Sequence, residues 1–291
     1  MVSDAPPKPV VTGVDGSSAA LHAVRWAAAE AQRRKAHLHL VFADVFSLVY
    51  LPELPTVPLP ESYATAVQRQ AKQWLRQAAD VAAGQAPELV VETEIRTGQA
   101  GAVLVNQSRD AQLVVVGSRG LGGFTGVIVG SIAVALSAHG HCPVAVVRGP
   151  DTALPDAPVV VGVDGSSGSD RALTLAFEHA LRRHVVLRVV HTWPSVNNGK
   201  AWWGGDQDTA QTDEERWLAE LMAGWSENFP DVEVQRFVAQ DKPARALLQH
   251  ARASQLVVVG ARGRGGFTGL LLGSTSQQLL QHSPCPVIVA R

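Results

Sequence analysis

The feature that most constrains this chain is a glycine-rich segment that occurs twice. The first copy, residues 113–131, runs from an apolar stretch through a glycine-rich loop to a Gly-Ser pair, and residues 256–274 repeat it. Glycine is tolerated, at a cost in backbone entropy, where the chain needs a positive φ or close approach to a ligand. The repeat therefore indicates that the backbone is the working part of this loop. At a constant shift of 143 residues, the matched glycines are Gly117, Gly120, Gly122, Gly123, Gly126 and Gly130 with Gly260, Gly263, Gly265, Gly266, Gly269 and Gly273.

The rest of the chain repeats with the loop, which predicts two copies of one domain. Short apolar stretches predict strands, and amphipathic stretches between them predict helices. In the first half the predicted strands are residues 9–14, 37–42, 89–95, 114–116 and 143–147. The predicted helices cover about 18–34, 67–82 and 131–139, with a further short helix around residues 103–104. In the second half the matching strands include residues 159–163, 187–190 and 232–237. Residues 150–158 have the proline content of a linker, so the predicted domains are 1–149 and 159–291.

Strands that alternate with helices predict an α/β fold. Right-handed crossovers would give a parallel sheet covered by helices on both faces. The continuous valine stretches, in place of strict alternation, agree with burial of both faces. Each half is therefore expected to be a doubly wound domain of about five strands, in which ligands bind beyond the carboxyl ends of the strands where the strand order reverses.

Composition narrows the class of protein. Apolar residues make up 46% and charged residues 18% of the 291 residues, a soluble globular balance. A formal net charge of -1 provides no basic field, so nucleic acid is not an expected partner. No apolar stretch approaches the length of a membrane span and the N-terminus lacks a signal-peptide pattern, so we expect no membrane partner and a cytoplasmic location. Cys142 and Cys285 occupy matching places in separate domains, so a disulfide is not indicated.

Two polar features follow strands in each half. Asp15 and Asp164 come directly after the first strand, and the glycine-rich loop comes after the fourth. A short acidic side chain can accept hydrogen bonds from a ribose hydroxyl or an exocyclic amine. The loop can offer backbone N–H groups to phosphates, and the helix that follows it favours an anion at its N-terminus. If the two strands are central neighbours, both features face one nucleotide pocket.

The spacing of these residues resembles a known family. Gly117-x2-Gly120-x9-Gly130-Ser131 and its second copy, which ends at Gly273-Ser274, are similar to the ATP-binding signature of the universal stress protein family. Asp15 and Asp164, each within Gly-Val-Asp-Gly-Ser-Ser, resemble the first-strand aspartate of that family. The resemblance covers nearly the whole chain as two tandem copies, and is strongest to the mycobacterial and other actinobacterial tandem members.

The resemblance implies a strand order of 3-2-1-4-5 and ATP, together with magnesium, in each half. It implies backbone contacts to adenine near the end of the second strand, at about Val41 and Val190. It also implies that the fifth strands, residues 144–147 and 287–289, pair domains within the chain or build a homodimer. The implied ATP-binding residues are Gly13, Asp15, Val41, Gly117, Arg119, Gly120, Gly122, Gly123, Gly130 and Ser131, and in the second half Gly162, Asp164, Val190, Gly260, Arg262, Gly263, Gly265, Gly266, Gly273 and Ser274.

Several of these residues also have a plain structural interpretation. The loop can be a tight connection without a ligand, and the two aspartates can form turns or cap helices, although Ser17 and Ser166 could cap as well. Arg119 and Arg262 either reach a phosphate or remain solvated.

Other residues with possible chemistry favour a structural interpretation or leave their role open. His139, His141 and Cys142 suggest a metal half-site, but packing is favoured because a closed zinc site needs four ligands. Residues 33–35 are interpreted as a solvated helix end. Residues 202–203, a Trp-Trp pair, can be a lid, a contact surface or local packing.

The sequence offers no evident catalyst. A Gly-x4-Gly-Lys-Ser/Thr motif is absent, so the usual P-loop lysine and magnesium-binding hydroxyl are missing. We therefore predict a protein, not an enzyme, that acts in stress adaptation or signalling through its nucleotide-dependent state with little or no turnover. The alternatives are a slow nucleotide hydrolase and a dimerising interaction module with vestigial pockets; an oxidoreductase is disfavoured because its fingerprint belongs after the first strand. A bulkier residue at Gly117 or Gly260 is expected to intrude on the phosphates without unfolding the domains.

Overall fold

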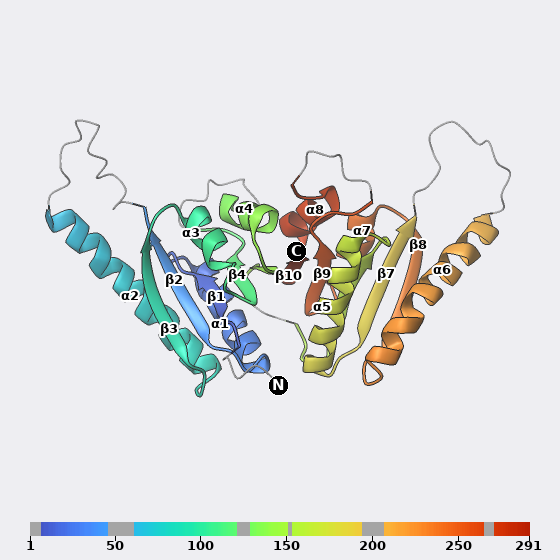
Figure 1. Ribbon diagram of the computed structural model, residues 1–291, viewed down its shortest axis with the longest axis horizontal. Helices are drawn as coiled ribbons and strands as arrows, with labels where there is room; N and C mark the ends of the chain where they lie inside the picture. The colour runs from blue at the N-terminus through green and yellow to red at the C-terminus, as the bar shows by residue number, and fades with distance from the viewer. Residues whose placement is uncertain (1–6, 46–60, 121–128, 151–152, 194–206, 265–270) are drawn as a thin grey trace. The chain divides into compact units, whose positions relative to one another are not determined.

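The computed structural model describes residues 7–45, 61–120, 129–150, 153–193, 207–264 and 271–291. The chain divides into two compact units, Met1–Asp151 together with Arg291, and Thr152–Ala290 (Figure 1). The predicted domain boundaries, at residues 149 and 159, stay a prediction.

The first unit is built from alternating strands and helices. Its described strands are β1 (Val10–Gly13), β2 (Leu38–Asp44), β3 (Val91–Thr97), β4 (Leu113–Gly117) and β5 (Val144–Val147). Its described helices are α1 (Ser18–Arg33), α2 (Glu61–Gln85), α3 (Ala100–Gln107) and α4 (Ser131–His139). All strand pairs are parallel and their order is β3-β2-β1-β4-β5.

The second unit repeats this arrangement. Its described strands are β6 (Val159–Val163), β7 (Leu187–Trp193), β8 (Val234–Gln240), β9 (Leu256–Gly260) and β10 (Val287–Ala290). Its described helices are α5 (Ser167–Arg183), α6 (Gln207–Asn228), α7 (Pro243–Ala251) and α8 (Ser274–His282). The parallel order β8-β7-β6-β9-β10 matches that of the first unit, so the predicted fold and strand order are confirmed.

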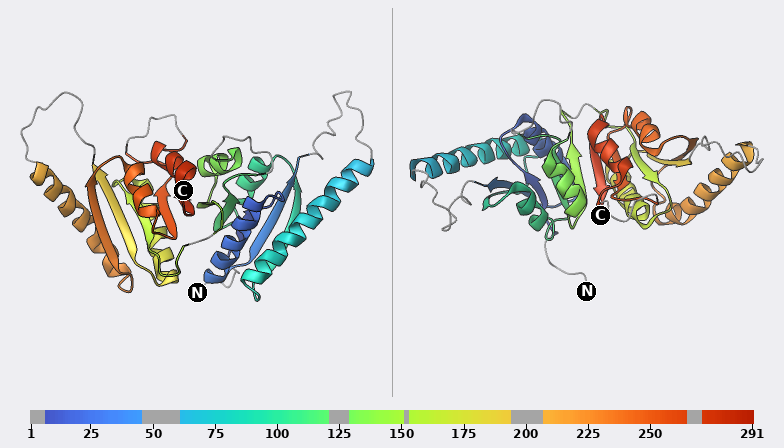
Figure 2. Two further views of the ribbon diagram at one scale, coloured as in Figure 1. Left: turned by 180° about the vertical axis from the view of Figure 1, so that it is seen from behind. Right: turned by 90° about the horizontal axis from the view of Figure 1, so that it is seen from above.

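Helices cover both faces of each sheet, as the views in Figures 1 and 2 show. In the first unit α1 packs on α2 and α3 packs on α4, which places one pair of helices on each face. The central strands are therefore buried on both sides: Val114 and Val115 in β4 and Val257 and Val258 in β9 are fully buried. The valine stretches follow from this two-sided burial.

The third strand of each unit differs from its predicted position. Residues 89–95 and 232–237 were expected, whereas β3 and β8 begin and end two to three residues later, at Val91–Thr97 and Val234–Gln240. The second strand also continues to Asp44 and Trp193. The pairing between the second and third strands extends to these residues and includes Asp44 with Thr97. Polar side chains are tolerated at the edge of the sheet, so a prediction based on apolar residues ends these strands too early.

Helix α1 ends differently from the expected solvated cluster at residues 33–35. Arg33 and Lys35 are exposed, but the Arg34 side chain is only 6% exposed. Its Nε donates to Oε1 of the fully buried Glu30 at 2.6 Å, and its Nη1 donates to Gln112 at 3.2 Å. The interpretation was wrong for Arg34 because a helix end that packs under a sheet can bury a cation that has a carboxylate partner.

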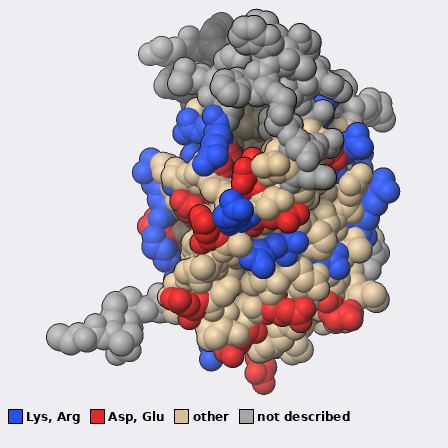
Figure 3. Space-filling model, turned by 90° about the vertical axis from the view of Figure 1, so that its right-hand side faces the viewer, with Lys and Arg blue, Asp and Glu red and all other residues tan. Residues whose placement is uncertain are grey.

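The face of the molecule in Figure 3 carries charges of both signs. Lys and Arg side chains are interspersed with Asp and Glu among the described residues visible there, so this face presents no field of a single sign. Among the described helices, none is both long and apolar enough to cross a membrane.

Candidate functional site

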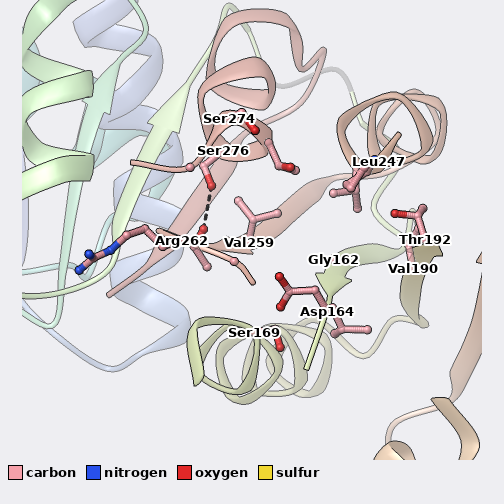
Figure 4. A pocket seen from close by; sticks show the side chains of 16 residues that line it. Gly162, Asp164, Ser169, Val190, Thr192, Leu247, Val259, Arg262, Ser274 and Ser276 are labelled. Atoms are coloured by element: carbon pink, nitrogen blue, oxygen red, sulfur yellow. Dashed lines mark hydrogen bonds between the residues drawn. The ribbon is translucent and has the colours of Figure 1, made fainter. Parts of the chain in front are cut away.

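A cavity of about 450 Å³ lies at the carboxyl ends of strands β6, β7 and β9 in the second unit. One end of the cavity is apolar and includes Val190, Leu247 and Val259. The other end is formed by the loop after β9 and by the first turn of α8, including Gly273 and Ser274. Figure 4 shows Val190 and Leu247 on one side and Ser274 on the other. The edge where doubly wound sheets bind ligands therefore holds a cavity in this unit.

Asp164, which follows β6, connects two walls of the cavity. Its Oδ1 accepts hydrogen bonds from the Ser166 backbone N–H at 3.0 Å and from the Ser166 hydroxyl at 2.6 Å. Its Oδ2 accepts the Arg264 backbone N–H at 2.8 Å. Burial raises the pKa of Asp164, but hydrogen bonds from Ser166 and Arg264 and the Arg264 charge outweigh it and hold the pKa below its usual value. Asp164 is therefore a carboxylate fixed in place by the turn and by the loop.

Asp15 has the same local geometry in the first unit. Its Oδ1 accepts from the Ser17 backbone N–H at 2.9 Å and from the Ser17 hydroxyl at 2.6 Å. Ser17 in turn caps α1, as its hydroxyl accepts from the Ala20 N–H at 3.1 Å. Ser166 caps α5 in the same way. The serines are thus the caps, and the aspartates shape the turn while keeping carboxylate oxygen at the edge of the sheet.

The aspartates and the glycine-rich loops approach each other closely. A Cβ atom added to Gly120 would collide with the Asp15 carboxylate, and one added to Gly263 would collide with the Asp164 carboxylate. Any larger residue would therefore displace the carboxylate or the loop. The structure brings together the two features that the sequence predicts would face one crevice.

Gly117 and Gly260 have a different role from the expected one. A Cβ atom on Gly117 would lie 2.7 Å from the carbonyl oxygen of Ala19 in α1, and one on Gly260 would lie 2.7 Å from the backbone of Gly168 in α5. A larger side chain there would strike the helix behind the strand. Close packing between helix and strand therefore requires glycine at these positions, which the sequence did not indicate, and the expected loss of phosphate binding without unfolding stays a prediction.

The loops close onto helix N-termini. Gly130 and Gly273 are the N-cap residues of α4 and α8, and their N–H groups donate to Ser118 at 2.7 Å and to Ala261 at 2.8 Å. The first N–H groups of a helix have no partner within the helix and carry partial positive charge. Ser131 and Ser274, the first residues of these helices, are exposed. This end of the site therefore suits an anion.

Val41 and Val190 were expected near the ends of their strands, but they lie in the middle of them. β2 and β7 each continue three residues further. The Val41 carbonyl accepts the Val14 N–H at 2.9 Å within the ladder. Val190 lines the cavity and is 3% exposed. The expected position was wrong because the second strand is longer than its apolar stretch.

Two further candidate glycines, Gly13 and Gly162, make room for a helix. A Cβ atom on either would lie 2.8 Å from a leucine side chain, Leu104 in α3 or Leu247 in α7. Leu104 was expected only as part of a short helix, and neither leucine was predicted to lie at the site, although their equal distance from the loop in both copies is a signal that points to them.

The two candidate arginines are exposed. Arg262 lines the cavity, but Figure 4 shows its side chain directed away from Asp164 and Ser274. Burial lowers the pKa of Arg148, and the charge of Arg119 lowers it further, so the guanidinium groups of these two residues lie near each other. The Arg262 side chain is therefore not directed at the loop end of the cavity in this structure.

Of the histidine and cysteine cluster only Cys142 packs in the core of the first unit; His139 and His141 are exposed, so the packing interpretation was wrong for the two histidines. Cys142 is buried, and this burial raises the pKa of its thiol to about 11. Among the described ranges, no group of three or more His, Cys, Asp or Glu side chains is arranged to hold a metal ion. The candidates Gly122, Gly123, Gly265 and Gly266, the repeated Gly126 and Gly269, and the tryptophan pair at 202–203 lie outside the described residues.

These features define a class of protein: two tandem doubly wound α/β domains, each with an aspartate and a glycine-rich loop meeting at the carboxyl edge of its sheet. The profile of the universal stress protein family matches residues 7–148 and again residues 157–291. The chain belongs to the universal stress protein family.

Relatives and solved structures agree with this assignment. A universal stress protein of Mycobacterium tuberculosis is 42% identical over 291 residues, which cover 97% of this chain and 96% of that protein. A second one from the same organism is 40% identical with the same coverage. The crystal structure of a universal stress protein from Archaeoglobus fulgidus aligns with a TM-score of 0.71 at 19% identity, over 97% of this chain and 98% of that one, which shows a shared fold.

Proposed function

We propose that each domain of this chain binds ATP at the carboxyl edge of its sheet, through the candidate glycines, aspartates and serines. The observation that carries this proposal is the cavity of the second unit, which has an apolar end at Val190 and Leu247 and an anion-favouring end at Gly273 and Ser274. A nucleotide has the same polarity, with a flat base at one end and phosphates at the other. The volume of about 450 Å³ is within the range of ligand pockets.

Magnesium would accompany the triphosphate rather than occupy a site of its own. Protein-bound Mg²⁺ commonly keeps several waters and uses one or two carboxylates together with substrate phosphates. Asp164 is a fixed carboxylate at this site, which fits that donor set, and the described residues contain no larger metal-binding cluster.

The nucleotide-dependent state, rather than turnover, is the proposed output in stress adaptation or signalling. Phosphoryl transfer requires positive charge held on the γ-phosphate. Of the described residues that line the cavity, the cation Arg262 points away from the phosphate end, which supports slow or negligible hydrolysis. We place this function in the cytoplasm, with the fifth strands pairing domains within the chain or between two copies of it.

Calorimetric titration of ligand-stripped protein tests the proposal. Two ATP molecules per chain are expected, and no heat with millimolar ATP would reject ATP binding. Native mass spectrometry of freshly purified protein reports retained nucleotide and subunit number together. Steady phosphate release well above background would instead support the slow hydrolase.

A further inference from the structure

The two units carry the same site with different side chains around it. Most residues that line the cavity of the second unit are identical to their counterparts in the first. Four of the differences replace a hydrocarbon side chain with one that carries a hydroxyl. The differing residues are Ser169, Thr192, Pro243, Thr275 and Ser276, in place of Ala20, Ala43, Ala100, Ile132 and Ala133.

Two of the four hydroxyls are already engaged within the protein. The Ser169 hydroxyl donates to the Ser166 carbonyl at 2.8 Å, and the Ser276 hydroxyl donates to the Gly260 carbonyl at 2.7 Å. Both residues are buried, at 3% exposure. These serines therefore hold the turn and the strand end, and they have given up the proton with which they could donate to a ligand.

The hydroxyls of Thr192 and Thr275 are different. Among the described residues neither hydroxyl forms a hydrogen bond, and both side chains are half-buried on the wall of the cavity. Thr192 lies two residues after Val190 in β7, so the two side chains project from the same face of the sheet. Figure 4 shows Thr192 beside Val190 and Leu247, at the apolar end.

Thr275 lies at the opposite end of the cavity. It is the second residue of α8 and directly follows Ser274, so it belongs to the helix terminus that suits an anion. Its counterpart Ile132 occupies the same position of α4 in the first unit and has no hydrogen-bonding group. A nucleotide that spans the cavity would thus meet one additional hydroxyl at each end in the second unit.

We propose that the two nucleotide sites are not equivalent and that the second unit holds the tighter site, with Thr192 and Thr275 as its specificity-determining residues. This inference rests on the proposed function. Thr192 hydrogen-bonds the polar edge of the base or the adjacent sugar, and Thr275 donates to a phosphate oxygen. ATP therefore fills the second unit first, and a single concentration of nucleotide can leave the chain half-occupied.

The size of the effect follows from the strength of one hydrogen bond. A neutral hydrogen bond such as that of Thr192 corresponds to about two- to tenfold in affinity, and the bond of Thr275 to a charged phosphate oxygen corresponds to about tenfold or more. The two hydroxyls act at separate ends of the ligand, so their effects should multiply. Removing the phosphate-end hydroxyl should weaken ATP more than AMP, because it acts on the phosphates.

Reciprocal exchange of the two residues between the units tests the inference in the full chain. With Thr192→Ala and Thr275→Ile, the tight step of a calorimetric ATP titration is expected to weaken by about twentyfold or more, while the weak step is retained. With Ala43→Thr and Ile132→Thr, the weak step should strengthen. Thr174→Ala, which removes an exposed hydroxyl of α5 that does not line the cavity, is the control and should change affinity by less than about twofold.

The outcomes separate the two proposals. If the wild-type chain binds no ATP, both the proposed function and this inference are overturned. If the wild-type chain binds ATP in two equal steps, or if the threonine exchange leaves the tight step unchanged, only this inference is overturned. Circular dichroism and thermal unfolding confirm that each variant is folded, and the near-isosteric Thr192→Val and Thr275→Val replace any variant that does not fold.

Discussion

The backbone N–H of Arg264 donates a hydrogen bond of 2.8 Å to Oδ2 of Asp164, across 100 residues of sequence. This bond joins the loop after β9 to the turn after β6. Asp164 also accepts from Ser166 within its own turn, so one carboxylate fixes both walls of the cavity. The loop is therefore positioned by a side chain that the ligand would also meet, which couples the stability of the second unit to the state of its site.

Acid should weaken the second unit through Asp164. Its pKa is lower in the folded chain than the ordinary value of 3.8, because hydrogen bonds and the Arg264 charge outweigh burial. A depressed folded pKa gives stability that is present above 3.8 and is lost as the pH falls through the folded pKa. Urea unfolding at a series of pH values should show this loss below about pH 4.

The variant Asp164→Asn tests this source of stability at neutral pH. An asparagine that keeps its oxygen towards Ser166 turns its amide donor towards the Arg264 N–H, so we expect a loss of about 1–2 kcal/mol. The acid-dependent loss should be smaller in the variant than in the wild type. Exposed Asp156→Asn is the control, and an equal effect of both changes would contradict the assignment.

The glycines of the loop should differ in their tolerance of alanine. Gly260→Ala brings a methyl group within 2.7 Å of the Gly168 backbone, so it should destabilise the second unit by about 1–3 kcal/mol. Gly273 has a φ of -70° and its nearest neighbour would lie 3.4 Å from the new atom, so Gly273→Ala should cost less. Thermal unfolding measures both. Equal costs would show that helix packing does not select glycine at position 260.

The pattern of the sequence predicted the fold because hydrophobic burial determines it. Continuous valines such as those of β4 and β9 require two covered faces, and a repeat with a constant shift requires two similar domains. The same pattern could not reveal which contacts the glycines make. Gly117 and Gly120 are equal in the sequence, yet one packs against α1 and the other against Asp15. That difference depends on which residues lie nearby in the folded chain, and a series of glycines in the sequence does not indicate this.

The sequence shows that the second unit has hydroxyl-bearing residues where the first has apolar ones, but it does not show what these residues do. Thr192 and Thr275 gained meaning only because the structure places them on the cavity wall, where their hydroxyls have no hydrogen-bond partner among the described residues. Likewise, Arg34 belongs to a basic stretch that is typical of a solvated helix end. Only the fold shows that Glu30, one turn earlier, is fully buried beside it.

Arg34→Ala should destabilise the first unit by about 2–4 kcal/mol. The change removes the 2.6 Å bond to the fully buried Glu30 and leaves Arg33 at 3.8 Å as a weaker neighbour. Removing one partner of a buried pair is costly because the other charge stays desolvated. Urea unfolding should show partial recovery in the double variant Glu30→Gln, Arg34→Ala, in which that charge is absent.

The second unit provides the matched comparison. Arg183 donates to Nδ1 of His179 at 2.7 Å and to Gln255 at 3.1 Å, so a histidine takes the place of the buried glutamate. Arg183→Ala should therefore cost less than Arg34→Ala, since no buried carboxylate is left behind. An equal or greater cost would show that the Glu30 charge is not the source of the penalty.

Cys142 should react slowly with alkylating agents while the chain is folded. Burial raises the pKa of its thiol from 9.0 to about 11, so the thiolate, which is the reactive form, is reduced about 100-fold at pH 8. Timed iodoacetamide labelling, read by peptide mass spectrometry, should show rapid modification only in denaturant. Labelling at similar rates in the folded and unfolded chains would contradict the burial of this thiol.

The second unit has a polar pair of side chains, His191 and Glu214, where the first unit has an apolar pair. His191 contacts Trp217 at 4.5 Å between ring centroids, and its Nε2 lies 3.0 Å from the Glu214 carboxylate. The counterparts in the first unit are Phe42, 5.8 Å from Trp74, and Ala71. Phenylalanine thus fits beside this tryptophan, which makes a double-mutant cycle with His191→Phe and Glu214→Ala practicable.

The cycle should give a favourable coupling of about 0.5–1.5 kcal/mol between the two residues. Glu214→Ala alone removes the partner of a ring that is 6% exposed, so it should destabilise the second unit. In the double variant the histidine is also absent, so that loss should largely disappear, and the second unit should have the packing of the first. Urea unfolding of the four proteins measures the coupling, and strictly additive effects would show that the contact is energetically neutral.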